Sequence, residues 1–353
     1  MSDYTAQLTL RGRIGGGQFG DVFEAGCPLN GKVAVKLLRQ KTGESPADWA
    51  ARSADLLAEA IKMKSAQHRN VVTVHQVVRD AHGVVHLVTE FCNAGSLDTD
   101  YKAGPLPLAK VRKIITHASA GLECVHSRGM VHRDIKPSNI LCHSGTFKIG
   151  DFGLVTDRII RGYASVAGYV SHLAPEVFGG ASRLGVTSAK TDVWALGMTV
   201  YRLLHGHSFF QDHFGLLTPA DFERKIVSGG FAVSLPWLPH VPERWRKFVR
   251  KAMHDDPTQR FPSAHAMSQA LAPLPISPSW ACQYAYNLVT WKKAEAGRTT
   301  TVEWVILSPR KHRWSAIKTG SAKRTICIGG TRGAEVNLTT ARTQLENFFA
   351  ASN

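Results

Sequence analysis

The secondary-structure pattern changes once along the main part of the chain, and this change constrains the fold more than any other feature. Residues 8 to 90 alternate short β-type runs with glycine turns, as in LTLRGRIGG, KVAVKLL and VVHLVTEF. One helical pattern, residues 46 to 66, interrupts them after Ser45-Pro46, a typical cap and first-turn pair. From about 105 to 275 the pattern is helical. Strands followed by helices predict an α+β protein with two segregated layers.

A proline-rich run separates this main part from the end of the chain. Residues 273 to 280, within LAPLPISPSW, indicate a linker or the end of a domain. Beyond them, TTTVEWVILS, HRWSAIKTG and KRTICIGG predict strands, and LTTARTQLENFFAA predicts a closing helix. We therefore expect a small C-terminal unit, residues 281 to 353, that combines β-structure with one helix.

The charge and composition restrict the partners and the compartment. The net charge of +16 favours acidic partners such as nucleic acid, anionic lipid, acidic proteins or nucleotide phosphates, although solubility alone would also explain it. No apolar run of about eighteen residues is present, so we expect no membrane span. The first residues lack the apolar core of a secretory signal, and the six cysteines are scattered without CxxC pairs. These features predict a cytoplasmic protein with reduced thiols.

A glycine-rich segment lies between the first two strand-like runs. Gly15, Gly17 and Gly20 follow the spacing GxGxxGxV. Glycine lets the backbone approach phosphate oxygens and adopt positive φ. Taken alone, the pattern is weak evidence, because a glycine-rich hairpin is often only a turn. A strand follows it here, whereas a dinucleotide-binding fold would need the glycines to open a helix.

Two further charged positions have a meaning only if the fold brings them together. Lys36 ends the strand-like run VAVK, and Glu59 lies among apolar neighbours on the helix predicted for residues 46 to 66. Each is ordinarily a solvated surface charge. They form a functional pair only if that helix packs on the sheet and the two charges meet.

The stretch VHRDIKPSNIL and the later KIGDFG contain polar groups that are expensive to bury unpaired. Asp134, Asn139 and Asp151 are oxygen ligands of the kind that Mg²⁺ prefers together with phosphate oxygens. An acid near such a metal can take or orient a proton from an attacking hydroxyl. Either motif alone is an ordinary turn. Chance does not readily produce the glycine-rich segment, VAVK, HRD and DFG together in this order.

With these motifs the sequence resembles a eukaryotic-type serine/threonine protein kinase over residues 8 to 272. The resemblance implies a bilobal fold, with a β-rich N-lobe that has one main helix and a helical C-lobe. It implies ATP and Mg²⁺ as cofactors and protein Ser/Thr hydroxyls as acceptors. Downstream, Ala174-Pro175-Glu176 resembles the APE element, Arg260 its buried partner, and Asp192 the residue that anchors the catalytic loop.

The resemblance also implies a role for each matching residue. Asp134 would be the catalytic base, Lys136 would neutralise the γ-phosphate, and Asn139 and Asp151 would hold Mg²⁺. Lys36 would hold the α- and β-phosphates and pair with Glu59. In the rest of the ATP site, the glycines over the phosphates would be Gly15, Gly17 and Gly20. The apolar residues around adenine would be Ile14, Val22, Ala34 and Leu141. Thr89 would be the gatekeeper and Glu90 to Cys92 the hinge, where Cys92 would offer backbone hydrogen bonds to adenine.

The segment before the APE element departs from the family pattern. Tyr169 and His172 stand where members of the serine/threonine branch usually have threonine and an aromatic residue, which puts acceptor specificity in question. Arg133 is the kind of arginine that pairs with a phosphate on this segment. We expect autophosphorylation here, with the candidates, in order, Ser165, Tyr163 and Thr156.

The C-terminal unit and the intact motifs leave alternatives. Residues 281 to 353 contain eleven Lys/Arg against four Glu, interleaved with tryptophans that could stack on nucleic-acid bases. A solvated basic face, or a regulatory or docking module, would also fit. The alternatives for the whole chain are a pseudokinase that serves as a nucleotide-binding scaffold, or a nucleic-acid-associated regulator. The intact phosphate- and metal-handling residues favour the active enzyme.

Overall fold

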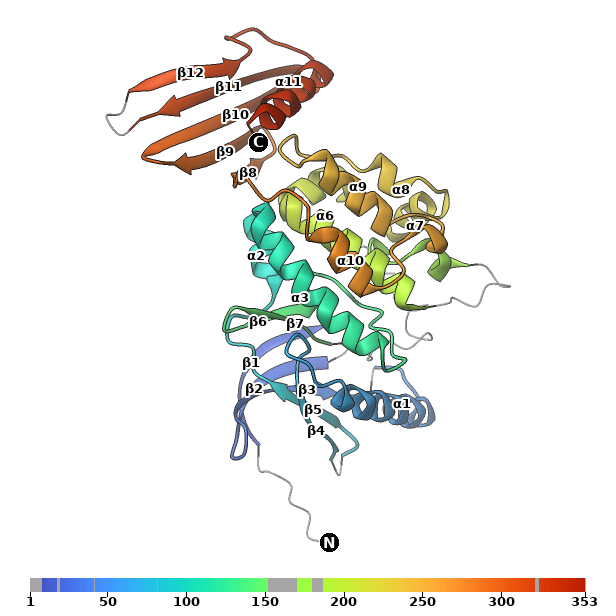
Figure 1. The fold of residues 1–353 in the computed structure, drawn as a ribbon. Coiled ribbons are helices and arrows are strands. Elements are labelled where there is room, and N and C mark those ends of the chain that lie inside the picture. The colour runs from blue at the N-terminus through green and yellow to red at the C-terminus, as the bar shows by residue number, and fades with distance from the viewer. Residues whose placement is uncertain are drawn as a thin grey trace. The chain divides into compact units, whose positions relative to one another are not determined.

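The computed structural model describes residues 8–17, 20–40, 42–80, 82–151, 170–179, 187–320 and 324–352, and of Glu59 it describes the backbone alone. The chain forms two compact units. The first comprises Met1–Ser96 and His117–Gly162, and the second comprises Leu97–Thr116 and Tyr163–Asn353. Figure 1 colours the elements along the chain.

The first unit contains an antiparallel five-stranded sheet with the order β1-β2-β3-β5-β4. The strands are β1 (Thr9–Gly17), β2 (Gly20–Cys27), β3 (Gly31–Leu38), β4 (Val74–Arg79) and β5 (Val85–Glu90). The β-branched Val33 and Val35 of β3 are fully buried on one face, where they pack with Ala25, Leu37 and Val88. The strands predicted from the alternating runs are therefore confirmed.

Helix α1 (Pro46–Ser65) is the main helix of this unit and packs on β4 and β5. Ser45 caps it, since its hydroxyl accepts a hydrogen bond from Asp48 N at 3.1 Å, and Pro46 occupies the first turn. Lys62 and Lys64 lie in the last turn, where they complement the helix dipole. The helix predicted for residues 46 to 66 is confirmed to within one residue.

A short hairpin completes the part of the first unit that concerns function. The turn η1 (Pro137–Asn139) leads into β6 (Ile140–His143), which pairs with β7 (Thr146–Ile149). The buried Asn70 fixes the hairpin, because its side-chain amide donates to Phe147 O at 2.8 Å and its carbonyl accepts from Ile149 N at 2.9 Å. The hairpin thereby brings the two ends of the segment from Asn139 to Asp151 close together.

The second unit begins with helices. They are α2 (Leu97–Ala103), α3 (Leu108–His126, which continues into the first unit), η2 (Pro175–Phe178), α6 (Ala189–Phe214), α7 (Pro219–Val227), α8 (Phe231–Ser234), α9 (Glu243–Ala252), η3 (Pro257–Gln259) and α10 (Ala264–Leu271). Helix α6 is buried for most of its length and begins with a capping box at Ser188. It bends at Gly206, where φ is 76° and a Cβ would lie 2.6 Å from Gly104 C.

The second unit ends in a separate antiparallel sheet with the order β12-β11-β10-β9-β8. Its strands are β8 (Ala281–Ala285), β9 (Leu288–Glu295), β10 (Arg298–Ser308), β11 (Lys311–Thr319) and β12 (Thr325–Gly330). Helix α11 (Leu338–Ala351) packs on one face, as Figure 1 shows. The register pairs Trp304 with Trp314 and Val302 with Trp291 on that face. The predicted C-terminal strands and closing helix are confirmed.

The C-terminal sheet packs against the helices of its unit through aromatic residues, a region called here the C-terminal interface. His240, which lies between α8 and α9, packs on Trp291 and Phe349 with ring centroids 5.8 and 6.1 Å apart. Trp280 packs on Phe349 at 5.1 Å, and Arg246 Nη1 pairs with Glu346 Oε1 at 2.7 Å. All but the last pair are nearly inaccessible to solvent.

The proline-rich run is bound to the helices too. Arg112 Nη1 donates to Ala272 O at 3.1 Å and Leu274 O at 3.3 Å. The indole N–H of the buried Trp245 donates to Pro275 O at 2.7 Å.

The predicted α+β class is confirmed. Within the described ranges, no helix combines the length and hydropathy needed to cross a bilayer.

Candidate active site

The acid, the lysine and the asparagine of VHRDIKPSNIL form one hydrogen-bond network. Asp134 Oδ2 accepts from Lys136 Nζ at 2.9 Å and from Asn139 Nδ2 at 2.7 Å. The same asparagine amide donates to the backbone carbonyl of Asp134 at 2.8 Å. The Asp134 side chain is only 4% exposed, so its charge is compensated by these partners rather than by bulk water.

Local backbone geometry fixes the network. Proline opens η1 directly after Lys136, and Asn139 N closes the turn on Lys136 O at 3.0 Å. Arg133, next to the acid, has a φ of 67°, which a residue with a Cβ rarely adopts. Such strain persists only where the surroundings impose it, and it is common at functional sites.

Lys36 and Asp151 meet although they are far apart in the sequence. Lys36 Nζ lies 3.0 Å from Asp151 Oδ2, with the lysine side chain 9% exposed and the aspartate 43% exposed. Asp151 also has a positive φ, 57°. Gly150 N donates to Asn139 O at 2.9 Å. This bond links the residue just before Asp151 to the network around Asp134. The expected pairing of Lys36 with the Glu59 side chain lies outside the described part and stays a prediction.

The two aspartates have pKa values shifted in opposite directions. Burial raises the pKa of Asp134 to about 6, and Asp151 adds to this rise, whereas Lys136 and Asn139 oppose it. Partial burial would raise the pKa of Asp151 as well, but the ammonium of Lys36, together with Lys136, outweighs it and holds the pKa below its usual value. Asp134 is therefore suited to accept a proton near neutral pH, and Asp151 to remain a carboxylate that binds a cation.

The glycine-rich segment is a β-hairpin between β1 and β2, as the strand pattern predicted. Gly17 pairs with Gly20, and Gly15 pairs with Val22. Gly20 has a φ of 129°, and a Cβ there would lie 2.1 Å from Leu37 O. Only glycine therefore lets the backbone at position 20 come this close to β3. Val22 in turn pairs with Lys36, which places the hairpin beside the lysine.

Of the residues expected around adenine, Ile14, Val22 and Ala34 lie on the neighbouring strands β1, β2 and β3, and Leu141 lies on β6. Ala34 pairs with the expected gatekeeper Thr89 on β5. Glu90 is already engaged. Its carboxylate accepts from Lys148 Nζ and Thr73 N, both at 2.7 Å, and its backbone N–H donates to Thr73 O. Cys92 is buried, and this burial raises the pKa of its thiol to about 12. Its carbonyl accepts from Gly95 N at 3.1 Å, so one of its two lone pairs is used.

In the second unit, the predicted partnership of Arg260 with the APE element is confirmed. Arg260 forms two hydrogen bonds with the Glu176 carboxylate, at 2.7 and 2.8 Å, and its side chain is fully buried. It also donates to His254 O at 2.7 Å and lies over the Trp194 ring. This bidentate pair fixes η2 to the helices.

His172 is buried beside an arginine that sequence reasoning missed. Arg202 Nη1 lies 3.5 Å from His172 Nδ1, and Arg202 Nε donates to the Tyr101 hydroxyl at 3.0 Å. The guanidinium also lies over the rings of Tyr101 and Phe210. An arginine within the apolar run TVYRLLHG was the available signal. Tyr169 and the candidate phosphorylation sites Ser165, Tyr163 and Thr156 lie outside the described residues.

The tryptophans of the basic C-terminal segments are not available for stacking on bases. Trp291, Trp304 and Trp314 are at most 7% exposed. Lys311 and Arg313 both lie 3.0 Å from Glu335, so part of the positive charge is compensated within the sheet. The C-terminal unit therefore provides charge on its surface without exposed tryptophan.

A sheet of this order followed by helices, an Asp–Lys–Asn network around the buried Asp134 and a Glu–Arg pair with a buried arginine define the class of protein kinases. The family model "Protein kinase domain" matches residues 8–271, and the chain belongs to this family.

Known relatives agree with this assignment. The chain is 33% identical over 230 residues to the serine/threonine-protein kinase TOS3 of Saccharomyces cerevisiae, covering 58% of this chain and 40% of that protein. It is 29% identical over 260 residues to the serine/threonine-protein kinase PrkC of Bacillus subtilis, covering 72% and 38%. A probable myosin light chain kinase of Dictyostelium discoideum is 31% identical over 261 residues, covering 70% and 68%. The chain thus spans about 40% of the length of the first two relatives.

Proposed function

We propose that the chain is an ATP-dependent serine/threonine protein kinase that transfers the γ-phosphate of Mg-ATP to Ser/Thr hydroxyls of proteins. The observation that supports it most is the buried network in which Lys136 and Asn139 both bind Asp134 Oδ2. Family membership and the names of the relatives support the acceptor class.

The residues present fit ATP and Mg²⁺. Asn139 and Asp151 supply hard oxygen donors, and no cluster of three or more His, Cys, Asp or Glu side chains in the described ranges could hold a metal by itself. Mg²⁺ ordinarily takes one or two carboxylates and completes its shell with phosphate oxygens and water. Asn139 and Asp151 would hold the ion, which supplies charge neutralisation on the phosphates. Lys36 would hold the α- and β-phosphates.

Asp134 has an oxygen left for the acceptor. Its Oδ1 is buried and has no hydrogen-bond partner among the described residues, while Oδ2 is held by Lys136 and Asn139. An acceptor hydroxyl placed at Oδ1 would be oriented and would give up its proton there. Lys136 would then neutralise the negative charge on the transferred phosphoryl group.

Two finer roles belong to the same proposal. Autophosphorylation at Ser165, with Tyr163 and Thr156 as further candidates, is supported by Arg133, a cation next to the catalytic base. A regulatory or docking role for residues 281–353 is supported by the C-terminal interface, through which a structural change in the sheet would reach α9.

The test is transfer of labelled γ-phosphate from Mg-ATP by the purified chain, with Asp134→Asn and Lys36→Met as controls and peptide mapping of the product. We expect label on Ser or Thr in the wild type and none in either variant. ATP binding without transfer to the chain itself or to a generic basic protein would instead support a pseudokinase. Label on the chain only at residues other than Ser165, Tyr163 and Thr156 would exclude these three sites.

A further inference from the structure

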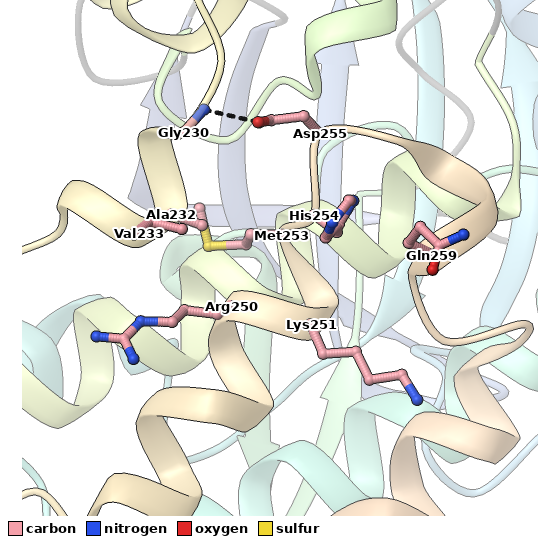
Figure 2. A pocket seen from close by; sticks show the side chains of 9 residues that line it. All are labelled: Gly230, Ala232, Val233, Arg250, Lys251, Met253, His254, Asp255 and Gln259. Atoms are coloured by element: carbon pink, nitrogen blue, oxygen red, sulfur yellow. Dashed lines mark hydrogen bonds between the residues drawn. The ribbon is translucent and has the colours of Figure 1, made fainter.

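A pocket of about 400 Å³ lies between α8 and the C-terminal end of α9 (Figure 2). This volume is within the range of pockets that bind small ligands. Ala232, Val233 and Met253 form its apolar part, and Arg250, Lys251 and Asp255 are among its polar residues. None of them belongs to the residues assigned to phosphate transfer.

The apolar part combines a buried floor with one exposed side chain. Ala232 and Met253 are 4% and 0% exposed, whereas Val233 is 69% exposed. An exposed valine beside buried apolar neighbours can gain contact area when another apolar side chain inserts next to it. The pocket therefore suits a partner that contributes a residue such as leucine.

The pocket also contains hydrogen-bonding groups that lack partners. Asp255 Oδ2 accepts from Gly230 N at 2.6 Å, a bond drawn in Figure 2, but Asp255 Oδ1 is buried without a partner in the described ranges. Arg250 Nε is likewise a buried donor without a partner there, although Arg250 Nη1 binds Glu243. Since buried polar groups are normally satisfied, an acceptor and a donor left in one pocket fit a peptide, which offers both N–H and C=O groups.

The surrounding charge is positive. Helix α9 contains five Lys/Arg and one Glu, and Arg244, Lys247 and Lys251 form no ion pair with any residue that the structure describes. Figure 2 shows Arg250 and Lys251 extending to different sides, so they flank the pocket rather than clamp one group inside it. A field of this sign attracts acidic segments. Because Ala232, Val233 and Met253 give the pocket an apolar part, a peptide with one apolar side chain and flanking carboxylates fits better than a nucleic-acid phosphate.

We propose that this pocket docks an acidic segment of a protein substrate, with one apolar side chain inserted beside Val233 and flanking carboxylates facing Lys251 and Arg250. The inference rests on the proposed kinase function, because it assigns to the substrate a contact away from the phosphate-transfer residues. Docking of this kind raises the local concentration of the acceptor and leaves the chemical step unchanged.

Binding is tested with the full chain and a fluorescein-labelled peptide, Glu-Asp-Glu-Leu-Glu-Asp-Glu, by fluorescence anisotropy. We expect Val233→Asp and Lys251→Glu each to weaken binding by at least about tenfold, as for a central contact. Replacing the leucine of the peptide by serine should weaken it similarly. Val227→Asp, at a valine that is 55% exposed on α7 outside the pocket, is the matched apolar control. Lys292→Glu on β9 matches the change in net charge, and both controls should change affinity less than about twofold.

Several results would overturn the proposal. Absence of binding by the leucine peptide would do so, as would equal losses in the pocket variants and their controls. Tighter binding of a twenty-residue oligothymidylate that Val233→Asp abolishes would identify a nucleic-acid site instead.

The consequence for catalysis is tested separately. When the acidic segment is fused to a serine-containing acceptor peptide, Val233→Asp should raise KM by about the same factor as Kd and leave kcat unchanged, because uniform binding is lost. A fall in kcat with unchanged KM would contradict docking. A wild-type chain that binds the acidic peptide but transfers no phosphate to any acceptor would refute the kinase function and leave the pocket as a peptide-binding site.

Discussion

The network around Asp134 and the C-terminal interface are both buried, but they are built from different interactions. The network consists of charges and hydrogen bonds between residues a few positions apart, next to a strained backbone at Arg133. The interface consists mainly of aromatic rings contributed by segments far apart in the chain, such as His240, Trp291 and Phe349.

This difference separates chemistry from stability. A buried polar network gains little net free energy of folding, because desolvation offsets the interactions formed. An aromatic interface removes a large apolar area from water and contributes directly to folding. Substitutions in the two regions should therefore affect different measurements.

The largest effect is expected for Asp134→Asn, which keeps the shape of the side chain and removes its capacity to take a proton. We expect kcat to fall by about 10³-fold, within the range usual for loss of a general base. The melting temperature should change by no more than a few degrees. Steady-state phosphate transfer and thermal unfolding check both values, and a folded variant with wild-type kcat would exclude Asp134 as the base.

Trp291→Ala should show the reverse pattern. Removal of a fully buried tryptophan from the C-terminal interface should lower the free energy of unfolding by about 3–5 kcal/mol. Urea denaturation measures the loss. Tyr286→Ala, at an aromatic residue 74% exposed near the same strands, is the control and should change stability by less than about 0.5 kcal/mol. Equal effects of both changes would mean that the aromatic packing does not stabilise the unit.

The interface should also make stability depend on pH through His240. Burial first, and then Arg246, lower the pKa of His240 to about 3 from the ordinary 6.5. As the pH falls below 6.5, His240 becomes protonated in the unfolded chain but stays neutral in the folded chain. The contribution of His240 to the free energy of unfolding is therefore fully present above pH 6.5 and declines as the pH falls toward 3. Between pH 7 and pH 5 this group should cost about 2 kcal/mol.

Urea denaturation of wild type and His240→Gln at pH 7 and pH 5 measures that cost. The wild type should lose more stability than the variant over this interval. The same loss in both proteins would show that His240 does not control the pH dependence of the interface.

The smallest effect is expected for the ion pair at the edge of the interface. Glu346 is 41% exposed, so Glu346→Gln should lower the free energy of unfolding by at most about 1 kcal/mol, and less at high salt. Measurements at 0.05 and 0.5 M NaCl check this screening. A loss of unfolding free energy as large as that for Trp291→Ala would contradict the prediction that the aromatic contacts, and not the ion pair, stabilise the interface.

The parts of the fold and site that depend on neighbouring residues could be predicted from the sequence. Ser45-Pro46 correctly marked the start of α1. The polar residues of VHRDIKPSNIL predicted a site in this stretch, but the sequence did not predict that Asn139 donates to Asp134. The pairing of Glu176 with Arg260 followed from the resemblance to a family, not from local spacing.

The contacts that were missed join residues distant in the sequence. Nothing local indicates that Lys148 binds Glu90 across 58 positions, or that Arg202 packs on Tyr101 across 101. Base stacking by the tryptophans of residues 281 to 353 was one of the alternatives that the sequence left open, yet the alternation in β9 places Val289 and Trp291 on one covered face. Recognising that face required knowing that α11 returns to cover it.

The bonds made by the proline-rich run have a practical consequence for protein engineering. A chain shortened at residue 275 would lose the strands that cover His240, and the new terminus would carry the carbonyl that accepts from Trp245. The uncovered aromatic surface would favour self-association, as large exposed apolar patches do. The helices of this protein kinase domain should therefore be expressed together with the C-terminal sheet, or with polar replacements on the surface that the sheet would otherwise protect.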